Sequence, residues 1–157
     1  MALYLSTFIN RIDRKGRVSV PAPFRAALAG EPYTGIVVFP SFRESYNAIE
    51  ACGMARMERL SASLDRLNPF SDEHDDFASV IFGASVQLPF DGEGRIILPP
   101  HLLEHAAISD QAAFVGRGAT FQIWEPGALH DFQNEAQRRA RAARATLKLD
   151  PSAGDGS

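Results

Sequence analysis

The chain contains the stretch Asp13-Arg14-Lys15-Gly16-Arg17-Val18-Ser19-Val20-Pro21, and a variant of it returns as Asp91-Gly92-Glu93-Gly94-Arg95-Ile96-Ile97-Leu98-Pro99. Equivalent positions of the two stretches lie 78 residues apart throughout. Each copy begins with an acid and a glycine-containing turn. Each then continues into a short strand that a proline ends, because proline cannot donate to a sheet ladder. The chain is therefore predicted to contain two copies of one structural unit.

The same series of elements is predicted around each copy. In the first half we expect strands at 4–12, 18–20, 35–39 and 45–49, and a short helix at 24–28. In the second half we expect strands at 85–90, 95–98, 112–115 and 120–125, and a short helix at 101–106. A unit of about 45 residues is too small to bury a stable core alone, so two units should pack their apolar faces together. The expected fold is α+β, mainly β, with a pseudo-symmetric, intertwined β-barrel-like core and peripheral helices.

Helical periodicity predicts further helices outside these units. One stripe is formed by Met54, Met57, Leu60, Leu64 and Leu67. Its spacing predicts a helix that Asn68-Pro69 ends and that belongs to the core or to a subunit interface. A short helix is expected at about 73–82. A third, C-terminal helix is expected over 128–149, and the Gly- and Ser-containing residues 150–157 are expected to form a disordered tail.

The composition fits a soluble globular protein, with 157 residues of which 45% are hydrophobic. No apolar run approaches the roughly 20 residues that cross a bilayer, and the N-terminus lacks the features of a signal peptide. We therefore expect a cytoplasmic protein that does not enter a membrane. Cys52 is the only cysteine, which excludes an intramolecular disulfide, and we interpret it as a packing residue.

Charge is distributed unevenly along the chain, although the net charge is only −3. Residues 1–30 carry five cations and one acid, and residues 138–148 carry five cations and no acid. The acidic block Asp72-Glu73-His74-Asp75-Asp76 lies between them. Because the local field matters more than the mean charge for a polyanionic partner, the net charge of −3 does not exclude nucleic acid as a ligand. The C-terminal arginines fit either a solvated basic helix packed on an oligomer neighbour or an auxiliary phosphate contact.

The first loop is the strongest candidate for a binding site. Arg14, Lys15 and Arg17 stand against Asp13 alone, which gives the loop a charge of +2. Cations on a tight turn reach phosphates, and an arginine can bind O6 and N7 of guanine with two hydrogen bonds. The aspartate is better suited to orienting an arginine or capping the turn. The alternative is a solvated hairpin without a partner.

The second loop has a charge of −1, because Arg95 stands against Asp91 and Glu93. Attraction to phosphates is weak there, so we expect Arg95 to pair with Asp91 and fix the turn. We therefore hypothesise divided roles, in which the first loop binds DNA and the second holds shape or register.

The segment His101-Leu102-Leu103-Glu104-His105 matches the H-x-x-E-H pattern of inverted zinc proteases. On a helix, its two histidines share a face and could hold zinc, with Glu104 as general base. However, the pattern fixes only three positions, and His130 is only a weak candidate for a third ligand. The repeat aligns the segment with 23–27, so we interpret it as a short helix that places leucines in the core. We predict no catalytic residue, no metal and no cofactor.

The stretch 13–21, followed by Phe24-Arg25, resembles the signature of the MraZ family of bacterial transcriptional regulators. Residues 91–99, followed by Leu102 and Leu103, are similar to the second motif of that family. The strand pairs that end at Ile49-Glu50 and at 121–125 also resemble family features. The resemblance covers roughly residues 3–147.

This resemblance implies two tandem SpoVT-AbrB-like swapped-hairpin units, which we place at 7–54 and 84–127. It also implies ring-shaped homo-oligomers that bind repeated promoter elements in double-stranded DNA, control of the division and cell wall gene cluster, and a location at the nucleoid. The Asp-x-x-x-Arg motif, which lies at the DNA-contacting surface of the family, falls on Asp13 and Arg17 and on Asp91 and Arg95. The chain departs from the family pattern at Glu93, where a neutral or basic residue is more usual.

The sequence thus predicts a sequence-specific DNA-binding transcriptional regulator rather than an enzyme. The residues expected at the DNA are Asp13, Arg14, Lys15, Arg17, Asp91 and Arg95. One loop should bind weakly, so affinity should come from loops on adjacent subunits that meet repeated boxes together. The alternative is an antitoxin-like or scaffold interaction module in which residues 126–157 grip a partner. Neither the DNA-binding regulator nor the interaction module requires a small-molecule substrate.

Overall fold

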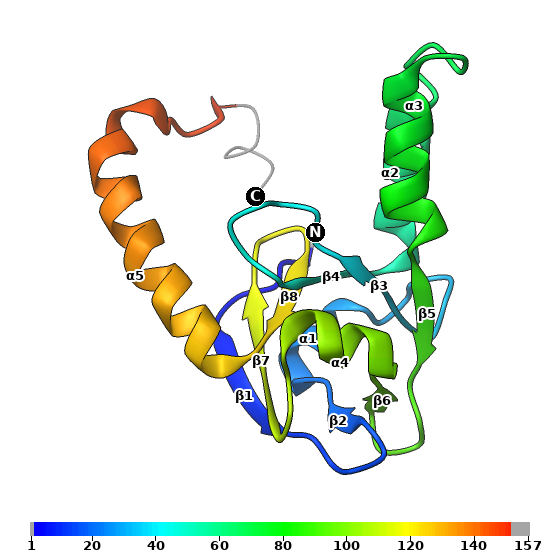
Figure 1. Cartoon of the computed structure of the whole chain (residues 1–157), viewed down its shortest axis with the longest axis vertical. Coiled ribbons are helices and arrows are strands. Elements are labelled where there is room, and N and C mark those ends of the chain that lie inside the picture. The colour runs from blue at the N-terminus through cyan, green and yellow to red at the C-terminus, as the bar shows by residue number, and fades with distance from the viewer. Residues whose placement is uncertain (1, 152–157) are drawn as a thin grey trace. The chain divides into compact units, whose positions relative to one another are not determined.

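The computed structural model describes residues 2–151. These residues divide into two units, one extending to Pro126 and one beginning at Gly127. The first unit is an α+β structure with a six-stranded and a two-stranded sheet, both antiparallel (Figure 1). No helix among the described residues has the length and apolar character needed to cross a bilayer.

The two halves of the first unit contain the same elements in the same order. The first half holds β1 (Thr7–Arg11), β2 (Arg17–Ser19), α1 (Ala22–Ala27), β3 (Gly35–Pro40) and β4 (Ile49–Cys52). The second half holds β5 (Val86–Pro89), β6 (Arg95–Ile97), α4 (Pro100–Ala106), β7 (Gln111–Gly116) and β8 (Phe121–Trp124). Between the halves lie α2 (Met54–Leu64), α3 (Asp72–Phe77) and the π-helix η1 (Ala78–Gly83).

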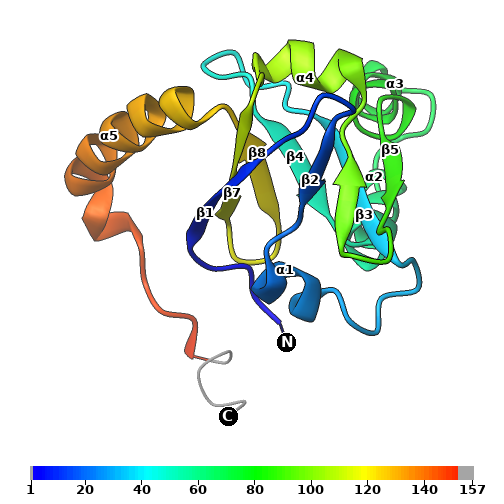
Figure 2. The same ribbon diagram turned by 90° about the horizontal axis from the view of Figure 1, so that it is seen from below.

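The six-stranded sheet has the order β1-β7-β8-β4-β3-β5, which is unchanged when the two halves are exchanged. The copies β1 and β5 lie at opposite edges of the sheet (Figure 1 and Figure 2). Each edge strand pairs with a strand of the other half, β1 with β7 and β5 with β3. In the central pair, Glu50 lies opposite Gln122, and each is the second residue of its strand. Neither half therefore builds its part of the sheet alone.

The strands β2 and β6 form a separate two-stranded ribbon. Val18 pairs with Ile96, which is its own copy 78 residues later. Equivalent hydrogen bonds extend the ribbon at both ends, because Leu98 N donates to Gly16 O at 2.9 Å and Val20 N donates to Gly94 O at 3.2 Å. A register centred on a residue and its copy places a local two-fold axis between the halves.

Copies also occupy equivalent places in the apolar core. The core cluster joins residues of the ribbon, the large sheet, α1 and α4. Its matched pairs, each with exposure of 1% or less, are Val18 and Ile96, Val20 and Leu98, and Phe24 and Leu102. Burial of such apolar side chains is the main force that holds the two halves of the first unit together. The core that the repeat predicts is therefore shared between the halves.

The structure corrects three of the predicted elements, one of which is the C-terminal helix, expected over 128–149 and ending at Ala143. The strand expected at 45–49 is a loop, and β4 begins only at Ile49. A hydrogen bond from Ser41 N to Ala48 O (2.9 Å) closes this loop, and the ring of Tyr46 packs on Trp124 with a centroid distance of 4.8 Å. The helix expected at 73–82 is α3 followed by the π-helix η1. Tyr46 of this loop therefore serves to pack the loop against the sheet.

The second unit contains most of α5 (Pro126–Ala143) and a short 3-10 turn, η2 (Arg144–Thr146). Within α5, Glu135 pairs with Arg138 and with Arg139. The Arg139 guanidinium lies 5.7 Å from the centre of the Phe132 ring, a cation–π contact. The predicted tail at 150–157 lies outside the described residues from 152 onward.

Candidate nucleic-acid interface

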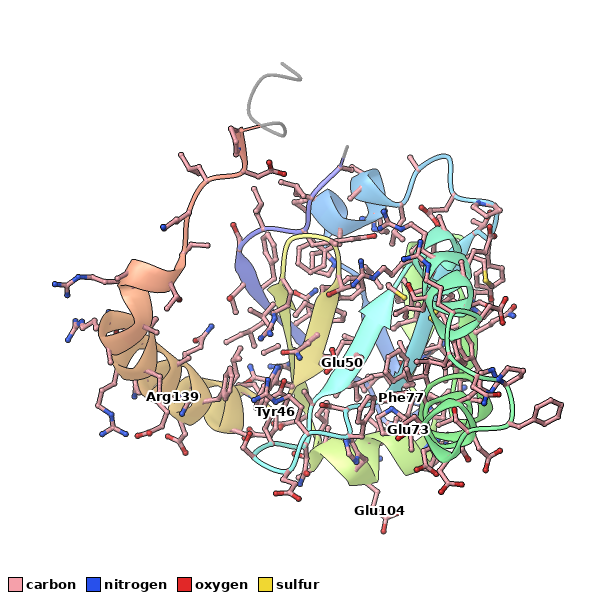
Figure 3. The ribbon with its side chains drawn as sticks, turned by 90° about the horizontal axis from the view of Figure 1, so that it is seen from above. Tyr46, Glu50, Glu73, Phe77, Glu104 and Arg139 are labelled. Atoms are coloured by element: carbon pink, nitrogen blue, oxygen red, sulfur yellow. The ribbon has the colours of Figure 1, made fainter. Side chains whose placement is uncertain are left out.

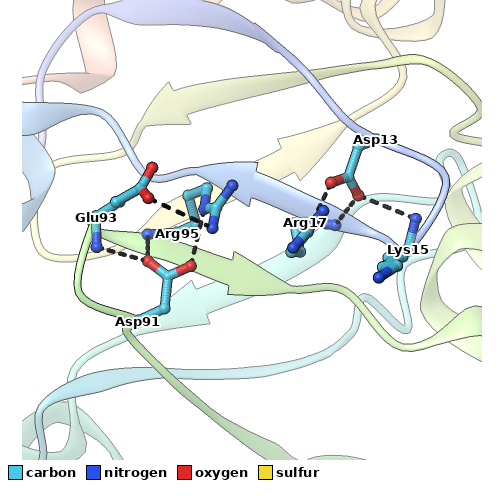
Figure 4. Close-up of polar contacts among 6 residues, drawn as sticks. All are labelled: Asp13, Lys15, Arg17, Asp91, Glu93 and Arg95. Atoms are coloured by element: carbon cyan, nitrogen blue, oxygen red, sulfur yellow. Dashed lines mark hydrogen bonds and ion pairs between the residues drawn. The ribbon is translucent and has the colours of Figure 1, made fainter.

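The loop between β1 and β2 is organised by the side chain of Asp13 (Figure 4). Asp13 Oδ1 accepts hydrogen bonds from the backbone N of Lys15 at 3.0 Å and of Arg17 at 2.9 Å. Asp13 Oδ2 accepts from Arg17 Nε at 2.6 Å. Gly16 completes the turn with a φ of +83°, a conformation that glycine adopts without steric cost. The aspartate therefore sets both the turn and the direction of the arginine.

The loop before β6 repeats these contacts. Asp91 Oδ1 accepts from the backbone N of Glu93 at 2.8 Å and of Arg95 at 2.9 Å, and Asp91 Oδ2 accepts from Arg95 Nε at 2.8 Å. The expected pairing of Arg95 with Asp91 is thus confirmed. In the first loop, Asp13 orients Arg17 and caps the turn, as expected of the aspartate there. The Asp-x-x-x-Arg motif forms the same structure in both halves.

These hydrogen bonds favour the ionised form of both aspartates. The backbone N–H of Arg17 is the largest cause that lowers the pKa of Asp13, followed by the side chain of Arg17 and the backbone of Lys15. In the second loop, the backbone N–H of Arg95 is the largest cause that lowers the pKa of Asp91. The hydrogen bond to Asp91 in turn raises the pKa of Arg95.

The ribbon presents one arginine from each half on its outward face. The central residue of each strand is buried, so the flanking residues of both strands point away from the core. Arg17 lies opposite Ile97, and Ser19 lies opposite Arg95. The two arginines are therefore diagonal neighbours, about 7–8 Å apart at their backbones. Ile97 is 58% exposed, so this face is not covered by the described part of the chain.

The two loops differ in charge at their middle positions. The first loop carries Arg14 and Lys15 where the second carries Gly92 and Glu93. No carboxylate of residues 2–151 lies within ion-pair distance of Arg14 or Lys15. Glu93 Oε1 lies 3.9 Å from Arg95 Nη2, a second carboxylate near that guanidinium (Figure 4). Within residues 2–151, Asp13 is the one carboxylate at ion-pair distance from Arg17.

Arg25 of α1 brings a cation to the second loop, which sequence reasoning missed. Its Nε donates to Val20 O at 3.0 Å. A Cβ added to Gly94 would lie 2.7 Å from the Arg25 guanidinium, so this group lies directly on the second loop. Arg25 and the loop also line a cavity of about 340 Å³. The pairing of β2 with β6 and of β3 with β5 brings them together, and a local sequence pattern does not reveal such pairings.

The H-x-x-E-H segment is part of α4 and packs as the repeat predicts. Leu102 is fully buried, and His105 Nε2 lies 3.0 Å from the carbonyl oxygen of Ala48. Among residues 2–151, no three His, Cys, Asp or Glu side chains are arranged to bind a metal ion. Cys52 is buried in a second apolar cluster, as predicted, and burial raises the pKa of its thiol to about 12.

An exposed antiparallel ribbon with anchored arginines is typical of proteins that bind nucleic acid through β-strands. Comparison with known proteins identifies the family. The family model described as "MraZ protein, putative antitoxin-like" matches residues 81–150. A "Transcriptional regulator MraZ" of Rickettsia bellii (strain OSU 85-389) is 50% identical over 149 residues, which cover 94% of this chain and 98% of the relative.

A second relative with the same name, from Rickettsia rickettsii (strain Sheila Smith), is 47% identical over 148 residues, with the same coverage of both chains. The chain therefore belongs to the MraZ family, whose members are transcriptional regulators and not enzymes.

Proposed function

We propose that this regulator binds double-stranded DNA sequence-specifically through the β2–β6 ribbon and its two loops. The observation that carries the proposal is the diagonal placement of Arg17 and Arg95 on the outward face of the ribbon. The major groove is about 12 Å wide and admits a two-stranded ribbon. Each arginine is held through Nε by an aspartate, which leaves its terminal amino groups to donate to bases or phosphates.

The two ends of the ribbon contribute unequally to this binding. At one end, Arg14 and Lys15 add cations that have no acidic partner among the described residues. At the other end, the carboxylate of Glu93 lies near Arg95 and offsets its positive charge. The guanidinium of Arg25 restores a positive charge at this end. Asp13 and Asp91 act by orienting the arginines. The first loop therefore supplies most of the affinity, and the second supplies shape, register and a weaker contact.

We further infer that residues 7–54 and 84–127 are tandem SpoVT-AbrB-like swapped-hairpin units that share one pseudo-symmetric, barrel-like core. Three relations of the strands support this inference. The edge strands are exchanged between the halves, and the ribbon and the central pair of the sheet are each centred on a residue and its copy. An exchanged arrangement of this kind fixes the two loops at opposite ends of one ribbon.

Several copies, arranged in a ring, would bind repeated promoter boxes, and the targets would be those of the division and cell wall gene cluster. One ribbon offers few cations, so a single contact is weak. Linked contacts gain about 10²–10⁴ in affinity when their geometry matches the spacing of the boxes. DNA binding would place the protein at the nucleoid.

The test is to measure binding to fragments from which boxes are removed one at a time, over a series of salt concentrations. We expect affinity to fall with each box removed, and log K to fall linearly with log salt as counterions are released. A scrambled fragment of equal length and the variant Arg14→Ala/Lys15→Ala/Arg17→Ala serve as controls, with folding checked by circular dichroism. Equal affinity for one box and for several, or for the scrambled fragment, would contradict the proposal.

An antitoxin-like interaction module is the second candidate. The wording of the matched family model and the exposure of Leu147 (86%) and Leu149 (97%) favour a protein contact near the C-terminus. A stoichiometric small protein bound to residues 126–157 of the purified chain, with no effect of the box sequence on DNA affinity, would support this module over the DNA-binding function.

A further inference from the structure

The helices α2, α3 and η1 form a hairpin that projects from the sheets of the first unit (Figure 1), and the apolar side chains between its arms are half-buried rather than buried. Neither α3 nor η1 contains a buried residue, and Met57 is the one buried residue of α2. Phe77 is 40% exposed although its ring lies 6.4 Å from the ring of Phe42. A half-buried apolar groove at the surface of a helical hairpin, with Phe77 and Val80 exposed beside it, is the kind of surface that a protein partner can cover.

A groove of about 230 Å³ runs between the two arms of this hairpin. It is lined by Leu60, Ser63, Leu64, Leu67, Phe77, Ile81 and Phe82. Four exposed carboxylates stand on the neighbouring α3, namely Asp72, Glu73, Asp75 and Asp76. Glu73 and Phe77 lie one turn apart on this helix, so acid and groove are adjacent (Figure 3). None of the four has an ion-pair partner within residues 2–151.

The C-terminal segment at 144–149 has the complementary chemistry. Leu147 and Leu149 are almost fully exposed, and the backbone at Leu147 is extended (φ −91°, ψ 122°). In extended chain, residues two apart share a face, so both leucines can point one way and Lys148 the other. Arg144 and Lys148 have no acidic partner among the described residues.

We propose that the hairpin groove of one copy binds residues 144–149 of another copy. Leu147 and Leu149 enter the groove, and Arg144 and Lys148 pair with the carboxylates of α3. Charge selects this occupant, because two acidic α3 helices brought together would repel each other. A contact between a groove and a tail is heterologous, so it repeats from copy to copy and produces a ring when the rotation closes. The inference does not depend on DNA binding.

A mixed-disulfide experiment on the full chain, without DNA, tests the contact directly. Ser63→Cys chains are mixed with Leu149→Cys chains, both positions being exposed and Ser63 lining the groove. We expect a 63–149 disulfide between chains, identified by mass spectrometry. The matched control is Ser109→Cys, an exposed serine outside the hairpin, which should give little cross-link with position 149. Absence of the 63–149 link, or preferential linkage of two Ser63→Cys chains, would overturn the proposal.

Charge exchange and leucine removal test the same contact at equilibrium. The exposed pair Leu147→Asp/Leu149→Asp should raise the dissociation constant between copies by more than about tenfold, because two leucines no longer leave water. Arg144→Glu/Lys148→Glu should also weaken the contact, and adding Asp72→Lys/Asp76→Lys should restore it. Light scattering measures the mass, and thermal unfolding checks the fold. An unchanged mass for the leucine variant, a monomeric wild type or a failed rescue would overturn the proposal, while the DNA-binding test above stands separately.

Discussion

The loop before β2 and the loop before β6 hold the same set of hydrogen bonds in surroundings of different charge. In both, an aspartate accepts from two backbone N–H groups and from the Nε of an arginine four residues later. At the third position of the loop, Lys15 stands in one and Glu93 in the other. The shape of both loops therefore depends on the aspartate, the glycine and the arginine. The second and third residues of each loop do not determine this shape and instead set the charge of the loop.

Contacts between the halves alter the charge around the second loop. By sequence alone, the second loop is acidic and a poor partner for phosphate. In the folded chain, the Arg25 guanidinium lies on Gly94 and restores a cation at that end. Its counterpart in α4 is Leu103, so the first loop receives no such addition. The difference in positive charge between the two ends of the ribbon is therefore smaller than the sequence indicates. The end with the first loop is still the more positive one.

The largest expected effect is on DNA affinity when either anchored arginine is removed. Arg17→Ala should lower affinity by about 100-fold and Arg95→Ala by about tenfold at one fixed salt concentration, since a good bidentate contact is worth about 1–3 kcal/mol. The smaller loss of affinity at Arg95 is expected because the carboxylate of Glu93 lies near that guanidinium and partly offsets its charge. Fluorescence anisotropy with a multi-box fragment measures both. Equal losses, with both variants folded and equally oligomeric, would remove the distinction between the loops.

Reversing the charge of the third loop residue should change DNA affinity less than removing Arg17 does. The change should have opposite signs in the two loops. Lys15→Glu should reduce affinity by about tenfold and lower the salt slope by about 1, and Glu93→Lys should raise both. Neither change removes a hydrogen bond of the loop, because this position contributes only its backbone N–H to the aspartate. Titrations at several salt concentrations provide the slopes. A slope unaffected by either change would show that the loops do not face phosphates.

The two turn glycines should differ in their effect on stability. Both have positive φ, so alanine costs about 1–2 kcal/mol at either position. At Gly16 the added Cβ would also lie 2.8 Å from the backbone oxygen of Leu98, whereas at Gly94 it would meet the movable side chain of Arg25. Gly16→Ala should therefore lower the free energy of unfolding more than Gly94→Ala, as measured by urea denaturation. The reverse order would contradict the described packing of the loops.

The smallest expected effect is a dependence of stability on acid pH that is the same in both loops. The pKa of Asp13 is lowered below its ordinary value of 3.8 in the folded chain. Its ionised form therefore stabilises the fold above that pH, and this contribution is lost as the pH falls through the lowered pKa.

The difference in Tm between the wild type and Asp13→Asn should accordingly be constant above about pH 5 and should shrink as the pH falls below the ordinary pKa. Asp91→Asn should behave in the same way, because the pKa of Asp91 is lowered by equivalent hydrogen bonds. Thermal scans at a series of pH values give both curves. A difference that does not change with pH would mean that ionised aspartate is not what holds the turns.

The repeat predicted the elements that local chemistry controls. Aspartate, glycine and proline fixed the two turns, the two short strands and the helices that follow them, at the places where the structure has them. The repeat predicted an intertwined core, but that β1 and β5 are the exchanged strands was beyond such reasoning, because pairing partners depend on long-range packing rather than on local sequence.

The same limit explains what was missed in the candidate sites. The position of Arg25 on the second loop follows from the pairing of β2 with β6. The stripe at 54–67 was assigned to core or interface, and only burial distinguishes Met57, which is in the core, from Leu64, which lines an open groove. Periodicity finds an apolar face but does not show what covers it.

Protection of thiols by DNA is the most direct test of the ribbon as the binding surface. Ser19→Cys and Ile97→Cys each place a thiol on its outward face, and Ser61→Cys places one on the exposed side of α2 as a control. The native Cys52 is buried, with a thiol pKa of about 12, and should not interfere. We expect saturating multi-box DNA to slow the labelling of positions 19 and 97 and to leave position 61 unchanged. Equal labelling of positions 19 and 97 with and without bound DNA would contradict a ribbon-borne interface.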